Sequence, residues 1–342
     1  MTFAGGSMSE IRQDPTTKEW VIIAKERAKR SHDFVSKRAG TDLPAYAPSC
    51  PFCPGNEAMT PPEIFSYQDK ENLSWQVRVF VNKFPALTPG GSMIRRVEDD
   101  FFLSMDGVGV HEVIVETPEH NKPLALMNDG GVGNVLRAYQ ERYNELSQLL
   151  FIQSIIIFKN HGPSAGTSLE HPHSQLVATP VVPRQIRMRY EVAIRHYDDT
   201  GRCLYSDLAS REREIGSRMV METDRFVVFH PFASRQPFET WIVPKISKEA
   251  CFGNASAEDL GDLAHVLRIT LLKLYRGLNN PDFNYVIDSA PVRDDNNDYY
   301  LWHLRIIPRL TEMAGFEIGS GIHINTTLPE ETAQFMRELK SE

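Results

Sequence analysis

The chain has few cysteines, no long apolar run and no surplus of positive charge, and each shortage excludes a class of protein. Lysine and arginine total 37 against 45 aspartate and glutamate residues, so no basic surface is expected to hold a nucleic-acid backbone. No run of about 18 apolar residues appears, and the first residues lack the pattern of a secretory signal. We therefore expect a cytoplasmic protein that binds neither nucleic acid nor a membrane.

Two of the four cysteines form a C-x2-C turn, Cys50-Pro-Phe-Cys53. In a reducing compartment such a pair is typical of a metal or redox site rather than of a structural disulfide. Tetrahedral zinc would need two further nitrogen or sulfur ligands, for which His111, His120 and His171 are candidates. The alternative interpretation is an unliganded cysteine pair in a proline-rich turn.

The order of predicted elements repeats along the chain. Two blocks, 75–180 and 224–310, each show strand, turn, strand, helix, strand and strand, judged from β-branched and aromatic runs and from apolar residues every three or four positions. The repeat predicts an α+β fold of two similar units from an internal duplication, each a mainly antiparallel sheet with packed helices. The predicted domains are 9–180 and 223–342, joined by a polar, arginine-rich linker at 181–222.

The run LEHPHSQL, residues 169–176, has His171, His173 and Gln175 at alternate positions, which in a strand share one face. A neutral imidazole is a good nucleophile near pH 7, so a histidine directed at an electrophile is one interpretation. A hydrogen-bonded structural histidine is the other. Pro172 lacks an N–H, which favours an edge strand beside an open groove.

Two further segments could meet an anion. The loop KNHGPSAGTS, 159–168, is rich in small residues whose backbone N–H groups can approach a phosphate, although ordinary loops share this composition. The segment KERAKR, 25–30, offers Arg27 and Arg30, or is simply a solvated basic turn.

Together these motifs resemble the galactose-1-phosphate uridylyltransferase family, a branch of the histidine-triad superfamily. The resemblance covers nearly the whole chain and rests on these segments in order: DPTTKEWVIIAKERAKR, CPFCPGN, RVFVNKFPAL, HEVIVETPEH, NHGPSAGTSLEHPHSQ, FHPFASRQPFETWIVPK and GFEIGSG. It implies a ping-pong transfer of UMP between a UDP-hexose and a hexose 1-phosphate, through a covalent uridylyl-histidine.

By this resemblance His173 is the nucleophile and Gln175 binds a phosphoryl oxygen of the intermediate. Other residues would bind phosphates, namely Ser168, Asn160, Arg27 and Arg30. Phe52 and Asn82 would contact the nucleoside, and Glu317 the sugar. The resemblance also implies one structural zinc per chain, with the ligands Cys50, Cys53, His120 and His171, and a homodimer.

The sequence also departs from the family. Some members have a second metal site built on an H-x-H run, but here that run is His303-Leu304-Arg305, so we predict that this site is absent and that each chain has one working site. Lys83 stands where well-known members have an acidic residue. An ADP-sugar phosphorylase or a hydrolase of the same superfamily therefore remains an alternative, as does a non-catalytic, zinc-braced interaction protein.

Overall fold

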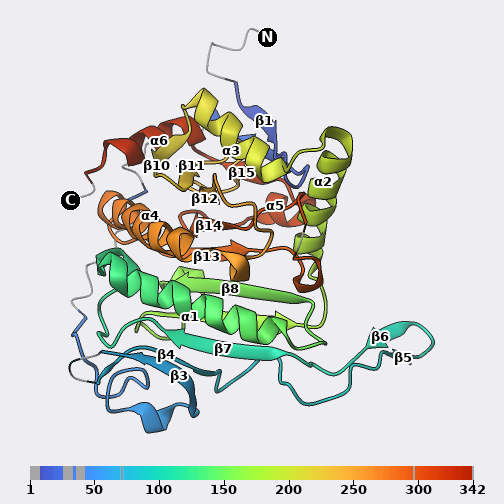
Figure 1. Ribbon diagram of the computed structural model, residues 1–342. Coiled ribbons are helices and arrows are strands. Elements are labelled where there is room, and N and C mark those ends of the chain that lie inside the picture. Colours follow the sequence, from blue (N-terminus) through green and yellow to red (C-terminus); the bar gives the residue numbers. More distant parts are fainter. Residues whose placement is uncertain are drawn as a thin grey trace.

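The computed structural model describes residues 8–25, 34–35, 43–69, 71, 73–295 and 297–340. Arg27 and Arg30 lie outside the described residues. Within these ranges the chain forms six α-helices and three β-sheets (Figure 1). None of the described helices has both the length and the apolar character needed to cross a membrane.

The largest sheet has ten strands, and every neighbouring pair in it is antiparallel. In spatial order the strands are β10 (Met219–Glu222), β11 (Phe226–Phe229), β12 (Thr240–Pro244), β14 (His303–Pro308), β13 (Phe283–Asp288), β8 (Ser154–His161), β9 (His173–Thr179), β7 (Val110–Val115), β4 (Trp75–Val81) and β3 (Glu63–Gln68). The mixed α+β class predicted from the sequence is confirmed.

The two halves of this sheet have the same internal order. Read from the outer edge inward, one half is β3, β4, β7, β9, β8 and the other is β10, β11, β12, β14, β13. The halves do not form separate sheets as expected, because β8 and β13 pair along five residues and make one continuous sheet. This pairing supplies partners for two rows of backbone N–H and C=O groups that would otherwise be exposed strand edges.

Residues 181–222, expected to be a linker, contain α2 (Arg184–Thr200), α3 (Leu204–Ile215) and the edge strand β10. Both helices bury a narrow face, through Tyr190 and Ala193 in α2 and through Tyr205 and Ala209 in α3. These helices were not predicted, because an average over a polar segment conceals a single buried helical stripe.

Two helices cover one face of the sheet side by side, α1 (Asp129–Ser147) and α4 (Ala257–Gly277) (Figure 1). Each begins at a side-chain cap: Asn128 accepts the N–H of Gly131, and Ser256 forms a capping box with Asp259. The predicted apolar face of the second helix is buried, and its members are Leu260, Leu263, Val266, Leu267, Ile269 and Leu271.

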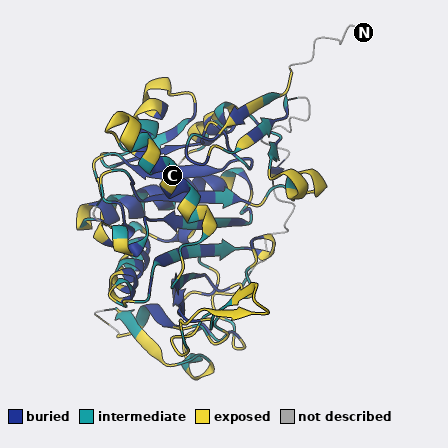
Figure 2. Cartoon of the chain, turned by 90° about the vertical axis from the view of Figure 1, so that its right-hand side faces the viewer, coloured by how far each residue is buried: buried dark blue, intermediate teal, exposed yellow. Residues whose placement is uncertain are grey.

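The remaining elements lie at the periphery. A three-stranded sheet combines β1 (Glu10–Gln13), β2 (Trp20–Ile23) and β15 (His323–Asn325), and the last helices are α5 (Gly315–Ser320) and α6 (Pro329–Glu338). The hairpin of β5 (Arg96–Glu98) and β6 (Phe102–Ser104) connects β4 to β7 and projects from the body (Figure 1). Its strands are almost entirely exposed (Figure 2).

Candidate active site and metal centre

Strand β9 carries the histidine motif and lies between β7 and β8, so the expectation of an edge strand is wrong. Pro172 is compatible with this interior position because it precedes the first strand residue, His173. Its carbonyl oxygen accepts the N–H of Glu116 at 3.1 Å, which extends the pairing with the chain after β7.

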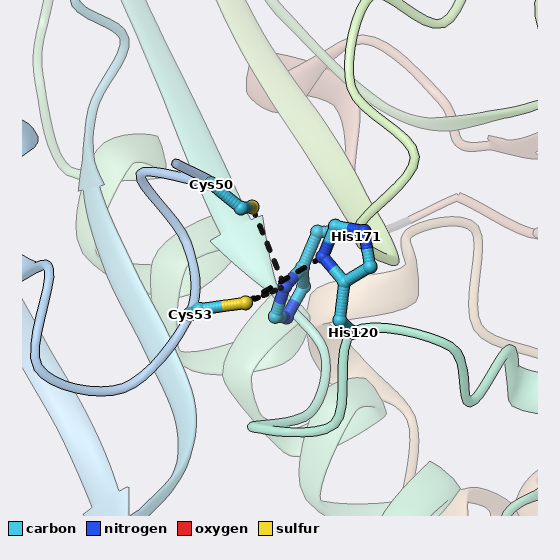
Figure 3. Close-up of side chains that lie close together, drawn as sticks. All are labelled: Cys50, Cys53, His120 and His171. Carbon is cyan, nitrogen blue, oxygen red and sulfur yellow. Dashed lines mark hydrogen bonds between the residues drawn. The ribbon is translucent and has the colours of Figure 1, made fainter. Parts of the chain in front are cut away.

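Four buried side chains meet beside the start of β9: Cys50, Cys53, His120 and His171 (Figure 3). Their ligand atoms all lie within 4.8 Å of one another. The Sγ of Cys53 is 3.5 Å from Nδ1 of His120 and 3.6 Å from Nδ1 of His171, and the Sγ of Cys50 is 3.7 Å from the same atom of His171. His111 is not part of this group.

This group fits a tetrahedral metal site. Bond lengths of about 2.3 Å to sulfur and 2.0–2.1 Å to nitrogen place S and N ligands roughly 3.6 Å apart at a tetrahedral angle, close to the separations found. The ring of His171 is also oriented as a ligand, because its Nε2 donates to the carbonyl of Thr117 at 2.7 Å and leaves Nδ1 facing the thiols. The residues therefore can hold a metal ion.

His173, two residues farther on, is held in a defined tautomer. Its Nδ1 lies 2.8 Å from the carbonyl oxygen of His171, so Nδ1 carries the proton and Nε2 carries a lone pair. Burial lowers the pKa of His173, and the nearby ammonium of Lys159 lowers it further against the opposing effect of the His171 carbonyl. The imidazole is therefore neutral near pH 7. The ring of Phe52 packs against it, with 5.3 Å between the two ring centroids.

Beneath β9, on the face toward α1, a buried polar network supports the strand. Lys159 donates to the carbonyl of His173 at 3.2 Å and to the carboxylate of Glu116 at 2.6 Å. Ser174 donates to Glu116 and accepts from Tyr139 of α1. This network was not predicted, although the position of Lys159 in an otherwise apolar run, SIIIFKN, signals a buried charge with a partner.

Two cavities meet at His173. One, of about 210 Å³, is lined by Asn160, His161, Ser168 and His173 among others. The other, of about 370 Å³, is mostly apolar and is lined by Phe52, Phe80, Phe84, Met59 and Val113, together with Asn82, Ser168, His173 and Gln175. Of the site residues predicted from the sequence, the structure thus brings six together around these cavities: Phe52, Asn82, Asn160, Ser168, His173 and Gln175.

Glu317 is elsewhere. It lies in α5, where its carboxylate accepts the N–H of Ala314, and it lines neither cavity. Asn160 is fixed across the centre of the sheet, because its Oδ1 accepts from Nδ2 of Asn284 on β13 at 2.8 Å. This contact was not predicted, since it depends on the pairing between the two halves.

The loop after β8 differs from the expected cradle of free backbone donors. The N–H of Ser164 donates to the carboxylate of Asp282 at 2.7 Å, and those of residues 165–167 bond to carbonyls of the same loop. Gly162 is required here, because its φ is +86° and a Cβ would lie 1.8 Å from a carboxylate oxygen of Asp282. An anion would therefore meet the Ser168 side chain rather than these N–H groups.

The equivalent position in the second half, His303 at the start of β14, repeats the backbone geometry. Its Nδ1 lies 3.0 Å from the carbonyl oxygen of Leu301, but the side chain is fully buried between Trp241 and Tyr205. Arg305, two residues later, pairs with the buried carboxylate of Asp288. This histidine has no access to a substrate.

Comparisons with known proteins agree with this geometry. The family model described as galactose-1-phosphate uridyl transferase, N-terminal domain, matches residues 5–183, and a domain of unknown function (DUF4921) matches 136–341. ADP-glucose phosphorylase of Arabidopsis thaliana is 37% identical over 333 residues, covering 96% of this chain and 93% of that protein. Galactose-1-phosphate uridylyltransferase of Thermotoga maritima is 29% identical and covers 98% and 100%.

Solved structures resemble the chain over nearly its full length. A crystal structure of the ADP-glucose phosphorylase from Arabidopsis thaliana with bound ADP-glucose has a TM-score of 0.82 and 34% identity, covering 97% of this chain and 100% of that one. A uridylyltransferase structure has a TM-score of 0.73 and 28% identity, covering 96% and 97%. The chain therefore belongs to the galactose-1-phosphate uridylyltransferase family, which also includes ADP-glucose phosphorylase.

Proposed function

We propose that the protein transfers a nucleotidyl group from a nucleotide sugar to a phosphate-bearing acceptor, with His173 as the nucleophile. One observation carries this proposal: Nδ1 of His173 is occupied by the His171 carbonyl, which leaves the Nε2 lone pair available where the two cavities meet. A neutral, oriented imidazole in that position is what attack on phosphorus requires.

In the first step Nε2 attacks the α-phosphorus, the bond between that phosphorus and the bridging oxygen breaks, and hexose 1-phosphate leaves with the bond electrons. In the second step an oxygen of the acceptor attacks the same phosphorus and the histidine regains its lone pair. We propose that Ser168, Gln175 and Asn160 donate to the phosphoryl oxygens, whose charge spreads during both displacements. Arg27 and Arg30 stay proposed phosphate contacts.

The apolar cavity is suited to a nucleoside, because Phe52, Phe80 and Phe84 offer aromatic and apolar surface for a base. Asn82 is the polar group proposed to meet the nucleoside on that side. The sugar and its phosphate would then occupy the smaller, more polar cavity next to Asn160.

For the donor we favour an ADP-hexose with inorganic phosphate as acceptor, giving ADP and hexose 1-phosphate. The support is the greater identity to ADP-glucose phosphorylase, 37%, than to the uridylyltransferase of Thermotoga maritima, 29%, together with Lys83 in place of an acidic residue. The UMP transfer expected from the sequence, from UDP-glucose to galactose 1-phosphate, is the second candidate and uses the same steps.

We propose that the metal is a structural zinc, one per chain, because four soft or borderline ligands close the coordination shell and leave no position for a substrate. Zinc bound there would hold the Cys50–Cys53 turn, His120 and His171 in fixed positions relative to one another. The carbonyl of His171 in turn orients His173. The ion would therefore act on the nucleophile through the backbone and through Phe52, which lies between the two cysteines and packs against His173.

We also propose a homodimer and a cytoplasmic location, and we attribute the matching strand orders of the two halves to an internal duplication. The hairpin of β5 and β6 supports the dimer, because Val97, Phe101, Phe102 and Leu103 are 61–82% exposed on a projection with no core of its own. The proposed sugar contact of Glu317 would be made within that dimer.

Intact mass spectrometry tests the proposal. The purified protein is incubated separately with ADP-glucose and UDP-glucose without an acceptor, beside His173→Asn and a control, His196→Asn, altered at a half-buried position of α2 that lines neither cavity. We expect an acid-labile adenylyl adduct on the wild type and the control but not on His173→Asn, discharged by phosphate. A uridylyl adduct discharged by galactose 1-phosphate would favour the second candidate. No adduct from folded, metal-loaded protein would favour a non-catalytic, zinc-braced protein.

A further inference from the structure

Gln175, one of the groups proposed to bind the transferred phosphoryl, is itself held by two other side chains. Its Oε1 lies 2.7 Å from Nε2 of His111 on β7 and 3.4 Å from Nδ2 of Asn82, which follows β4. Neither contact follows from the motif around His173, because three strands must pair before these side chains meet.

The tautomer of His111 follows from its second nitrogen. The backbone N–H of Ala86 donates to Nδ1 at 3.0 Å, and a backbone N–H can only donate. Nδ1 must therefore carry the lone pair, so Nε2 carries the proton and donates to Gln175. His111 is mostly buried, with 8% of its surface exposed, and its own backbone lies in an interior strand.

Asn82 is oriented by the same logic. Its Oδ1 accepts the backbone N–H of Phe84 at 2.9 Å, so its amide nitrogen must be the end that faces inward. That nitrogen is 3.1 Å from Nε2 of His111, and both atoms carry protons directed at one acceptor, Oε1 of Gln175. Two fixed backbone donors thus dictate which end of each side chain faces Gln175.

A reversed Gln175 would press its NH₂ group against two N–H donors, so the amide has one permitted orientation. Its oxygen faces His111 and Asn82, and its nitrogen is the end left for the cavity that Gln175 shares with His173. We propose that His111 is a positioning residue: it fixes the Gln175 amide so that an N–H group, not the carbonyl oxygen, meets the phosphoryl group transferred to His173. This inference rests on the proposed function.

The first test is kinetic and uses the full-length, metal-loaded protein. His111→Phe keeps a ring of similar size but loses both nitrogens, while His111→Gln restores an N–H donor on a chain of similar reach. We expect His111→Phe to slow single-turnover formation of the nucleotidyl adduct about 10- to 100-fold, because a misplacement of roughly 1 Å can cost about 100-fold in rate. The KM for the donor should change little, the final adduct should be the same, and His111→Gln should recover part of the rate.

The second test asks whether His111 acts through Gln175. In a Gln175→Ala background His111→Phe should cause no further loss, because the group that it orients is gone. An undiminished loss in that background, or an unchanged rate in the single variant, would overturn the inference. If wild-type protein forms no adduct at all, the proposed function fails instead, which separates the two outcomes.

A third measurement does not depend on any variant folding. ¹⁵N NMR of imidazole-labelled wild-type protein reports the protonated nitrogen of each neutral histidine, and we expect the His111 signal to show a proton on Nε2 and none on Nδ1. The opposite tautomer would refute the proposal whatever the activity, because Nε2 could then not donate to Gln175.

Discussion

The buried salt bridge beneath β9 has a matched counterpart on the surface of the protein. Lys159 and Glu116 are separated by 2.6 Å, with side-chain exposures of 2% and 0%. Lys122 and Glu119 are also separated by 2.6 Å, but with exposures of 38% and 48%. The two pairs share residue types and distance and differ in burial, so replacing each lysine by methionine isolates the effect of burial.

Lys159→Met leaves Glu116 buried without its cation, which typically costs about 3–5 kcal/mol of unfolding free energy. The surface change Lys122→Met should cost roughly 0–1 kcal/mol, because water already solvates both groups. At about 2 °C per kcal/mol, Lys159→Met should lower the melting temperature by roughly 6–10 °C. Urea denaturation at constant m-value and thermal melts measure both quantities.

A double variant, Lys159→Met with Glu116→Gln, should regain part of the loss because no uncompensated charge remains. Equal, small losses in the two single variants would refute the inference that burial makes the loss of the cation from this pair costly. The same change affects chemistry: the ammonium of Lys159 helps to hold the pKa of His173 down, so Lys159→Met should move the acid limb of adduct formation to higher pH.

Three further changes test other parts of the structure. Cys53→Ser should bind less metal, measured by atomic absorption, and should melt at a lower temperature, measured by calorimetry. Cys203→Ser, which changes a cysteine outside the four-residue ligand group, should leave the metal content and the melting temperature unchanged. Burial lowers the pKa of His230 to about 3 and of His303 to about 4, so the unfolded chain binds more protons below pH 6.5. Unfolding free energy should therefore fall between pH 6.5 and 4, by on the order of 3 kcal/mol per histidine, in urea titrations, and a flat profile would contradict this. Phe102→Asp in the exposed hairpin should shift sedimentation toward the monomer, and an unchanged dimer would exclude the hairpin as its contact.

The sequence was most informative where one element carries the whole signal. The helix around Leu263 follows from periodicity, and a strand was expected within 169–180, although β9 begins only at His173 and leaves His171 before it. The resemblance identified the four clustered metal-ligand candidates. Contacts between neighbouring strands could not be predicted, because period-2 alternation shows which face of the sheet a residue lies on but not which strand it pairs with. The contacts of His111 with Gln175 and of Asn160 with Asn284 are of that kind.

Other failures have local causes. Pro172 suggested an edge strand, but a proline directly before the first strand residue removes no ladder hydrogen bond from the strand. The glycine-rich loop suggested free backbone donors, yet Asp282, which follows more than a hundred residues later, accepts one of them. Composition describes which groups a segment contains, and only the folded chain decides which of them stay available to a ligand.

The pairing of β8 with β13 makes the protein a natural subject for split-protein complementation. A cut at the turn around Gly201, between α2 and α3, would leave two fragments, in which β8 and β13 respectively have no partner strand on one side. Alone, such fragments would be prone to aggregate through that edge. Together they would restore the hydrogen bond from Asn284 on β13 to Asn160 on β8, so recovered turnover would report on reassembly of the sheet.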